Sequence, residues 1–156
     1  MAPAQKPHRS VQEVETPPEL ITAVEQRFGK IDFDLAASAS NAKGPRFYTK
    51  ADDSLTQSWQ LGPSVRVAWI NPEFGDARRY AEKCCAAREL RRWTLLLVPM
   101  GTQDWACKYL WGKAHVLKLK GRVIFVNHAQ GFPKDLVLAA YGYGLAGEDV
   151  WDWRAS

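Results

Sequence analysis

The first clear periodicity lies near the N-terminus, where apolar residues recur at the three- and four-residue spacing of one helix face. The apolar positions are Leu20, Ile21, Val24 and Phe28. Just before them, TPPEL places Thr16 at an N-cap position, proline in the first turn and Glu19 three residues after the cap, as in a capping box. With Gly29 as a stop signal, the sequence predicts a helix that is capped by Thr16 and ends before Gly29.

Short apolar runs bounded by turn residues predict the strands of a sheet. They are residues 31–38 (IDFDLAAS), 65–70 (VRVAWI), 93–100 (WTLLLVPM) and 135–142 (DLVLAAYG). The third run is apolar on both faces, which is typical of a central strand in a sheet that is covered on both sides. Residues 114–125 (AHVLKLKGRVIF) alternate instead, which predicts an exposed strand or a hairpin that bends near Gly121.

Helix-like segments separate several of these runs. Residues 76–92 (DARRYAEKCCAARELRR) predict a helix capped by Asp76, and residues 102–111 (TQDWACKYLW) predict another. Residues 41–53 (NAKGPRFYTKADD) are polar and predict a surface loop, followed by a short helical turn in residues 54–59. Strands that alternate with helices predict an α/β sandwich with a mainly parallel sheet.

The length of 156 residues and the apolar content of 46% fit one ordinary domain. We place it at residues 16–145, after a polar N-terminal arm of residues 1–15 that lacks the apolar core of a signal peptide. Residues 146–156 mix polar and aromatic side chains and predict a C-terminal tail, either disordered or a docking segment. The longest apolar run is far shorter than the roughly 20 residues of a membrane-spanning helix, so we expect a soluble protein with no membrane partner.

The cysteines, the histidines and the net charge exclude few classes of function. The cysteines are Cys84, Cys85 and Cys107, and the histidines are His8, His115 and His128. Neither set has metal-ligand spacing, so we expect no metal site and free thiols in a reducing cytoplasm. His115, inside an apolar strand, is expected to be structural. A net charge of +4 with a pI near 9.0 permits a polyanionic partner without requiring one.

The stretch AWINPEFGD, residues 68–76, carries the strongest candidate chemistry. In open α/β sheets, ligand-binding groups gather at the carboxyl ends of strands. The side-chain oxygen of Asn71 and the carbonyl of Pro72 could accept two hydrogen bonds from one exocyclic amino group while Phe74 stacks on the base, which suits a flipped adenine. The structural alternative is that Asn-Pro after a strand is an ordinary turn.

Several segments in a fixed order favour the interpretation as a site. They are TPPEL, FDLAASASNAKGPRFYTKADDSLTQSW, VAWINPEFGDARRYAEKC, TLLLVPMGTQDWACKYL and LKGRVIF. In this order, over roughly residues 16–141, the chain resembles the phage-type DNA N-6-adenine methyltransferases, the Dam family of phages and prophages. The resemblance implies a single compact Rossmann-like methyltransferase sandwich, S-adenosylmethionine as methyl donor and adenine N6 in double-stranded DNA as acceptor, by base flipping.

The resemblance also implies where the cofactor binds. FDLAAS resembles the family's acidic segment at a strand end, which would place Asp34, Ala36 and Ser38 beside the methionine part of the cofactor. A carboxylate there can hold the cofactor's ammonium group. Thr16 and Pro17 of TPPEL would join them. The structural alternative for Asp34 is a helix cap.

A second family pattern follows. Its positions are Asn41, Tyr48, Asp53, Leu55 and Trp59. By analogy Asn41 lies on the cofactor side, and Asp53 accepts a hydrogen bond from the cofactor's adenine or ribose. Alternatively, Asp53 forms a turn and Trp59 belongs to the core, and for Trp59 we favour the core.

NPEF stands where the family has NPPY. Both acceptors are kept, and Phe74 keeps the stacking face without the hydroxyl. Glu73 departs from the pattern by removing a rigid φ and adding a carboxylate near the site of methyl transfer. We favour a tolerated departure. The alternative from another functional class is a non-catalytic module that keeps the fold and binds DNA or a host protein.

Basic and aromatic side chains outside this turn are candidates for DNA contact. They are Tyr48, Arg78, Arg79, Lys83, Lys118, Lys120 and Arg122. The lysines and the arginine of LKLKGR alternate on one face of their predicted strand. The alternative for each charge is an ordinary solvated surface.

Overall fold

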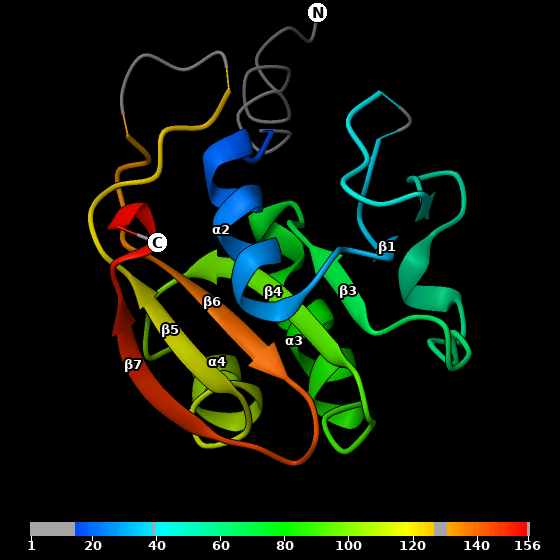
Figure 1. Ribbon diagram of the computed structural model, residues 1–156. Helices are drawn as coiled ribbons and strands as arrows, with labels where there is room; N and C mark the ends of the chain where they lie inside the picture. Colours follow the sequence, from blue (N-terminus) through cyan, green and yellow to red (C-terminus); the bar gives the residue numbers. More distant parts are fainter. Residues whose placement is uncertain (1–14, 39, 127–130, 156) are drawn as a thin grey trace, which may run out of the picture.

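In this computed structural model, residues 15–38, 40–126 and 131–155 are described. They form one seven-stranded sheet in the order β2-β1-β3-β4-β6-β5-β7 (Figure 1). The strands are β1 (Phe33–Asp34), β2 (Arg46–Phe47), β3 (Val67–Ile70), β4 (Trp93–Pro99), β5 (His115–Leu119), β6 (Leu136–Tyr141) and β7 (Gly147–Trp151). Only the β4–β6 and β5–β6 pairs are antiparallel, so the expected mainly parallel, Rossmann-like methyltransferase sheet is confirmed.

In the described part of the chain, three helices cover the two faces of the sheet (Figure 1). They are α2 (Pro18–Phe28), α3 (Ala77–Ala86) and α4 (Asp104–Tyr109), with short 3₁₀ turns η2 (Ser54–Thr56), η3 (Phe74–Asp76) and η4 (Trp153–Ala155). Successive side chains of a strand point to opposite faces. In β4, Leu95 and Leu97 therefore pack with α2, while Leu96 and Val98 pack with α3 and α4. This double burial explains why β4 is apolar on both faces.

The predicted cap of the first helix is wrong. Pro17, not Thr16, occupies the N-cap position of α2, and no side chain caps the helix. The Thr16 hydroxyl accepts a hydrogen bond from Nδ2 of Asn71 instead. Thr16 therefore bonds to a residue that is distant in the sequence instead of capping its own helix.

Several predicted boundaries also change. The helix expected over residues 76–92 ends at Ala86, and the loop over 41–53 contains the two-residue strand β2. Residues 114–125 form no hairpin, because β5 ends at Leu119 and lies between β6 and β7. No helix in the described part of the chain is long and apolar enough to span a membrane.

The C-terminal boundary at residue 145 is wrong as well. β7 pairs in parallel with β5 over five residues, and the following η4 turn contacts α2. Trp151 and Trp153 are buried in the core cluster that includes α2. In GEDVWDWRAS the apolar residues are interspersed with charged ones and do not alternate regularly, so this segment has no strand periodicity. The predicted N-terminal arm lies outside the described residues apart from Glu15.

Candidate active site

The carboxyl ends of β1 and β3 lie side by side because the two strands are parallel neighbours, with Asp34 opposite Trp69. The chain leaving each strand therefore enters the same space. A cavity of about 30 Å³ lies there. Its lining residues are Glu15, Thr16, Asp34, Ala36, Asn41, Lys43, Trp69 and Asn71. The structure thus brings together five of the predicted site residues: Thr16, Asp34, Ala36, Asn41 and Asn71.

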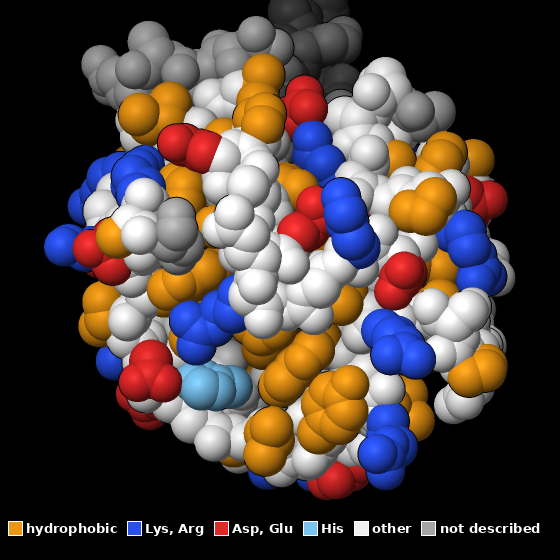
Figure 2. All heavy atoms as spheres, viewed as in Figure 1, with side chains coloured by type: hydrophobic (Ala, Val, Ile, Leu, Met, Phe, Trp, Pro, Cys, Tyr) orange, Lys and Arg blue, Asp and Glu red, His pale blue; other side chains and the backbone are white. Residues whose placement is uncertain are grey.

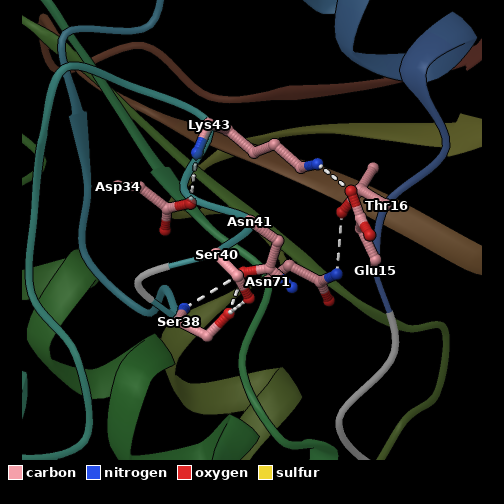
Figure 3. Close-up of polar contacts among 8 residues, drawn as sticks. All are labelled: Glu15, Thr16, Asp34, Ser38, Ser40, Asn41, Lys43 and Asn71. Atoms are coloured by element: carbon pink, nitrogen blue, oxygen red, sulfur yellow. Dashed lines mark hydrogen bonds and ion pairs between the residues drawn. The ribbon is translucent and has the colours of Figure 1, made fainter.

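Asn71 is the first residue after β3, and its amide points toward the segment that precedes α2 (Figure 3). Nδ2 donates to Thr16 Oγ1 at 2.7 Å. Thr16 is only 1% exposed, so water does not compete for this bond. The next residue, Pro72, is buried. The bond joins two sequence motifs 55 residues apart and fixes the orientation of the amide.

Asp34 organises the loop that follows β1. Its Oδ1 accepts from the backbone N–H of Ala36 at 3.1 Å, and its Oδ2 accepts from that of Lys43 at 2.9 Å. Burial raises the pKa of Asp34 to about 6, because desolvation of the charged form outweighs these hydrogen bonds and the nearby Lys43 charge. The helix-cap alternative does not apply, since no helix begins at Asp34.

Lys43 lines the cavity together with Glu15. Its Nζ reaches across to Oε2 of Glu15 at 2.8 Å, and Figure 3 shows this side chain extending from the Asp34 loop to the segment before α2. Neither residue was a candidate from the sequence, because no pattern relates two charges 28 positions apart. The cavity as it stands is much smaller than the roughly 300 Å³ of the smallest ligand pockets.

The other predicted cofactor residues are placed less directly. Ser38 donates through both its N–H and its hydroxyl to Oδ1 of Asn41, so these two side chains hold their own turn together. Asp53 precedes η2 with a φ of 50° and does not line the cavity. Trp59 is 5% exposed and donates to the backbone oxygen of Ser54, which confirms the core interpretation.

The two residues after Pro72 have partners that sequence reasoning did not identify. Oε2 of Glu73 pairs with Nζ of Lys50 at 3.2 Å, which links the turn to the loop after β2. The Phe74 ring contacts Phe132 edge-on, with 5.2 Å between ring centroids and 82° between planes. Phe132 also contacts Phe125, 5.8 Å away. These contacts set the position of the Phe74 ring.

Most candidate DNA contacts have partners within the protein. The ion pairs are Lys118 with Glu148 (3.3 Å), Lys120 with Asp152 (3.3 Å), Arg122 with Asp135 (3.0 Å) and Arg79 with Asp76 (3.7 Å). Tyr48 packs on Phe33 with 4.8 Å between ring centroids, and Lys83 Nζ donates to the backbone oxygens of Leu55 and Gln57. Arg78 is exposed and has no ion pair with any residue that the structure describes.

His115 is also paired, with 2.8 Å between its Nε2 and Oδ2 of Asp149 on β7. This contact joins two strands and fits the predicted structural role. His8 and His128 lie outside the described residues. In the described part of the chain, no three His, Cys, Asp or Glu side chains are grouped as metal ligands would be. Cys84 and Cys85 are buried free thiols, and Cys107 is an exposed one.

Comparison with known proteins agrees with the sequence resemblance. The family model described as DNA N-6-adenine-methyltransferase (Dam) matches residues 4–137. A DNA N-6-adenine-methyltransferase of Escherichia phage T1 is 31% identical over 84 residues, which cover 54% of this chain and 34% of the phage protein. The match thus spans about a third of that relative's length. Since the family model covers most of the sequence, the chain belongs to the DNA N-6-adenine-methyltransferase (Dam) family.

Proposed function

We propose that this protein transfers a methyl group from S-adenosylmethionine to N6 of adenine in double-stranded DNA. The observation that carries the proposal is the position of Asn71. Its amide lies at the carboxyl end of β3, in the same cavity as the buried carboxylate of Asp34, and it is oriented by Thr16. An acceptor for the target amine and an acidic group for the donor are thereby adjacent.

Asn71 and Pro72 act on the target amino group. With Nδ2 engaged by Thr16, the remaining amide atom of Asn71 is the acceptor Oδ1. Together with the carbonyl of Pro72, it accepts hydrogen bonds from the two N–H groups of the adenine amine and leaves the nitrogen lone pair directed at the donor. No general base is required, because the proton leaves after nitrogen has been methylated. Positioning in a dry site supplies most of the rate.

Phe74 provides the stacking plane for the flipped base. Stacking on an aromatic ring is worth roughly 1–3 kcal/mol per base. The edge-on contact with Phe132 limits the orientations of the Phe74 ring before the base arrives. Less ordering is then required on binding.

The residues around Asp34 have the chemistry needed for the cofactor, which supplies a methyl group on a sulfonium. The Asp34 carboxylate suits the ammonium, while Thr16, Pro17, Ala36, Ser38 and Asn41 border its amino-acid part. The cavity does not hold the whole molecule in this conformation. Lys43 and Glu15 must therefore separate as the cofactor enters, and Asp53 would contact its adenosine end.

Glu73 is a tolerated departure in this proposal. Its pairing with Lys50 at 3.2 Å offsets much of the negative charge that would otherwise face DNA. For the DNA backbone, Arg78 is the best placed cation, because it is exposed and lies in the first turn of α3, just after the catalytic turn. Tyr48, Arg79, Lys118, Lys120 and Arg122 would first have to leave their present partners.

The test is incubation with S-adenosylmethionine and unmethylated duplex DNA, followed by nucleoside mass spectrometry. N6-methyladenine should appear with the wild type and be absent with Asn71→Ala, while Lys134→Gln, an exposed change away from the cavity, should leave the yield unchanged. Folded protein that yields only methylcytosine, or no methylated base on varied DNA, would refute the proposal.

The small volume of the cavity favours one alternative, a non-catalytic module that retains the fold and binds DNA or another protein. Calorimetry distinguishes the two functions. The enzyme should bind S-adenosylmethionine, and Asp34→Ala should weaken that binding more than Asn71→Ala does. A module without catalytic function should bind none.

A further inference from the structure

A second and much larger cavity lies at the opposite end of the sheet from Asn71. Its volume is about 620 Å³, and its walls include Leu61, Arg66, Leu90, Arg91, Arg92 and Tyr143. In Figure 1 the turns before β4 and after β6 meet at this lower end. Arg66 precedes β3 and Asn71 follows it, so at about 3.3 Å per residue the two lie about 16 Å apart. This cavity is separate from the proposed active site.

Three arginines give the cavity its charge. Arg66 and Arg91 are exposed, whereas Arg92 is 5% exposed. Among the described residues, no carboxylate pairs with any of their guanidinium groups. The nearby carboxylate of Asp32 accepts from the backbone N–H groups of Arg66 and Val67 instead. The cavity therefore holds uncompensated positive charge.

Arg92 is the least satisfied of the three. Its Nε donates to Thr94 Oγ1 at 3.2 Å, but its Nη2 is buried and has no acceptor among the residues that the structure describes. Burial lowers the pKa of Arg92, because the charged guanidinium has lost water. A buried charged donor without an acceptor is costly, so native proteins usually satisfy it with a partner. Because this nitrogen is out of reach of solvent, a ligand in the cavity would contact it only after the Arg92 side chain had moved.

The other walls are apolar and held in place. Leu61 is buried, and Tyr143 is 44% exposed with its ring 5.0 Å from that of Trp93. Tyr143 has a φ of 57°, a left-handed conformation that is unfavourable for a residue with a side chain. Its backbone N–H donates to the oxygen of Leu90 at 2.9 Å, which braces this conformation. Strained residues held in this way are concentrated at ligand sites.

We propose that this cavity binds a phosphate monoester joined to a planar apolar group, as in a mononucleotide. Arginine forks match phosphate oxygens in geometry and charge, and the exposed guanidinium groups of Arg66 and Arg91 suit a dianion. Tyr143, Leu61 and Leu90 offer a surface for a flat ring. The volume lies within the roughly 300–1,000 Å³ of small-molecule sites. In Figure 2, cationic and hydrophobic side chains lie side by side at this end of the molecule.

Isothermal titration calorimetry with thymidine 5′-monophosphate tests the site, because thymine lacks the amino group for which Asn71 and Pro72 are proposed. The wild type should bind it saturably, inorganic phosphate more weakly and thymidine not at all. Arg66→Gln combined with Arg91→Gln, both at exposed positions, should weaken binding at least tenfold. Lys134→Gln removes one exposed charge elsewhere and should change nothing, and Asn71→Ala should also bind normally.

An oligothymidylate without a terminal phosphate identifies the source of the phosphate. If it binds through the same arginines and more tightly than the monophosphate, the site receives a nucleic-acid backbone; if it binds more weakly, the site receives a free nucleotide. Absence of saturable binding of the monophosphate up to about 1 mM, a weak affinity of roughly −4 kcal/mol, would overturn the proposal. So would full binding by the double variant, or loss of binding in Asn71→Ala.

Discussion

Replacing Thr16 by valine isolates the contact that orients Asn71. Valine has nearly the shape of threonine and lacks the hydroxyl, so packing at this site, only 1% exposed, should be kept. The change removes the acceptor of the 2.7 Å bond from Asn71 Nδ2 and leaves every atom of Asn71 in place. Any loss of activity then results from a changed orientation of the Asn71 amide and not from the loss of its chemical groups. Thr16→Ser keeps the hydroxyl and is the matched control.

The expected loss of rate in Thr16→Val follows from the burial of this hydrogen bond. A buried donor that loses its acceptor costs about 1–3 kcal/mol. The amide will recover part of this by rotating toward another acceptor, and the rotation moves Oδ1 away from the target amine. A loss of about 1.4 kcal/mol in transition-state stabilisation lowers the rate about tenfold. Thr16→Val should thus lower kcat by roughly tenfold or more, with a smaller change in the affinity for DNA.

Single-turnover methyl transfer to duplex DNA, with radiolabelled S-adenosylmethionine in excess, measures this rate. Thermal unfolding of each variant, followed by circular dichroism, shows whether the fold is kept. If Thr16→Val is folded and transfers methyl groups as fast as the wild type, Thr16 does not orient Asn71. Equal losses in Thr16→Val and Thr16→Ser would likewise refute the reasoning, since the serine hydroxyl should restore most of the rate.

Three more predictions concern other residues. Glu73→Gln should change the rate of methyl transfer less than about tenfold, and Glu73→Pro should leave it equal or faster. The reason is that an exposed ion pair such as Lys50–Glu73 contributes only about 0–1 kcal/mol. A larger loss of rate in the same transfer assay, at unchanged cofactor affinity, would show that the carboxylate serves the chemistry. Asp34 has a folded-state pKa of about 6, above the ordinary value of 3.8, so its contribution to stability is greatest below about pH 4 and is lost as the pH rises through 6. The free energy of unfolding of the wild type relative to Asp34→Asn, from urea titrations, should fall by about 3 kcal/mol across that window, and a flat difference would contradict the burial argument. Trp153→Ala should lower the free energy of unfolding by about 3–5 kcal/mol, because Trp153 is 2% exposed, whereas an unchanged melting temperature would mean that the C-terminal segment does not pack.

Sequence patterns predicted the parts of this fold that follow from local periodicity. The apolar run of β4, the amphipathic face of α2 and the turn after β3 all lie where the pattern indicates. Local rules failed where a distant partner competes, as when the Thr16 hydroxyl bonds to Asn71 and not to its own helix. β7 was missed because only Trp151 is buried, while Glu148, Asp149 and Val150 are all exposed and give no alternation.

The candidate site shows the same division. Asn71 and Pro72 were candidates because they follow a predicted strand, at the edge of the sheet where ligands bind. Asp34 was a candidate because FDLAAS resembles the family's acidic segment. The ion pairs Lys43–Glu15 and Lys50–Glu73 were not predicted, because each joins two charges on segments that are distant in the sequence. Such pairs depend on how loops fold over the sheet, which neither spacing nor composition encodes.

The parallel pairing of β7 with β5 has a consequence for solubility. β5 carries Val116, Leu117 and Leu119, all buried, and without β7 its backbone would form an open edge lined by these side chains. Open apolar edges recruit strands from other molecules and lead to aggregation. β7 carries the charged side chains Glu148 and Asp149 at the outer edge instead, and charged residues on an edge strand disfavour pairing with another molecule. The last strand thus protects the sheet from self-association and also contributes to the core.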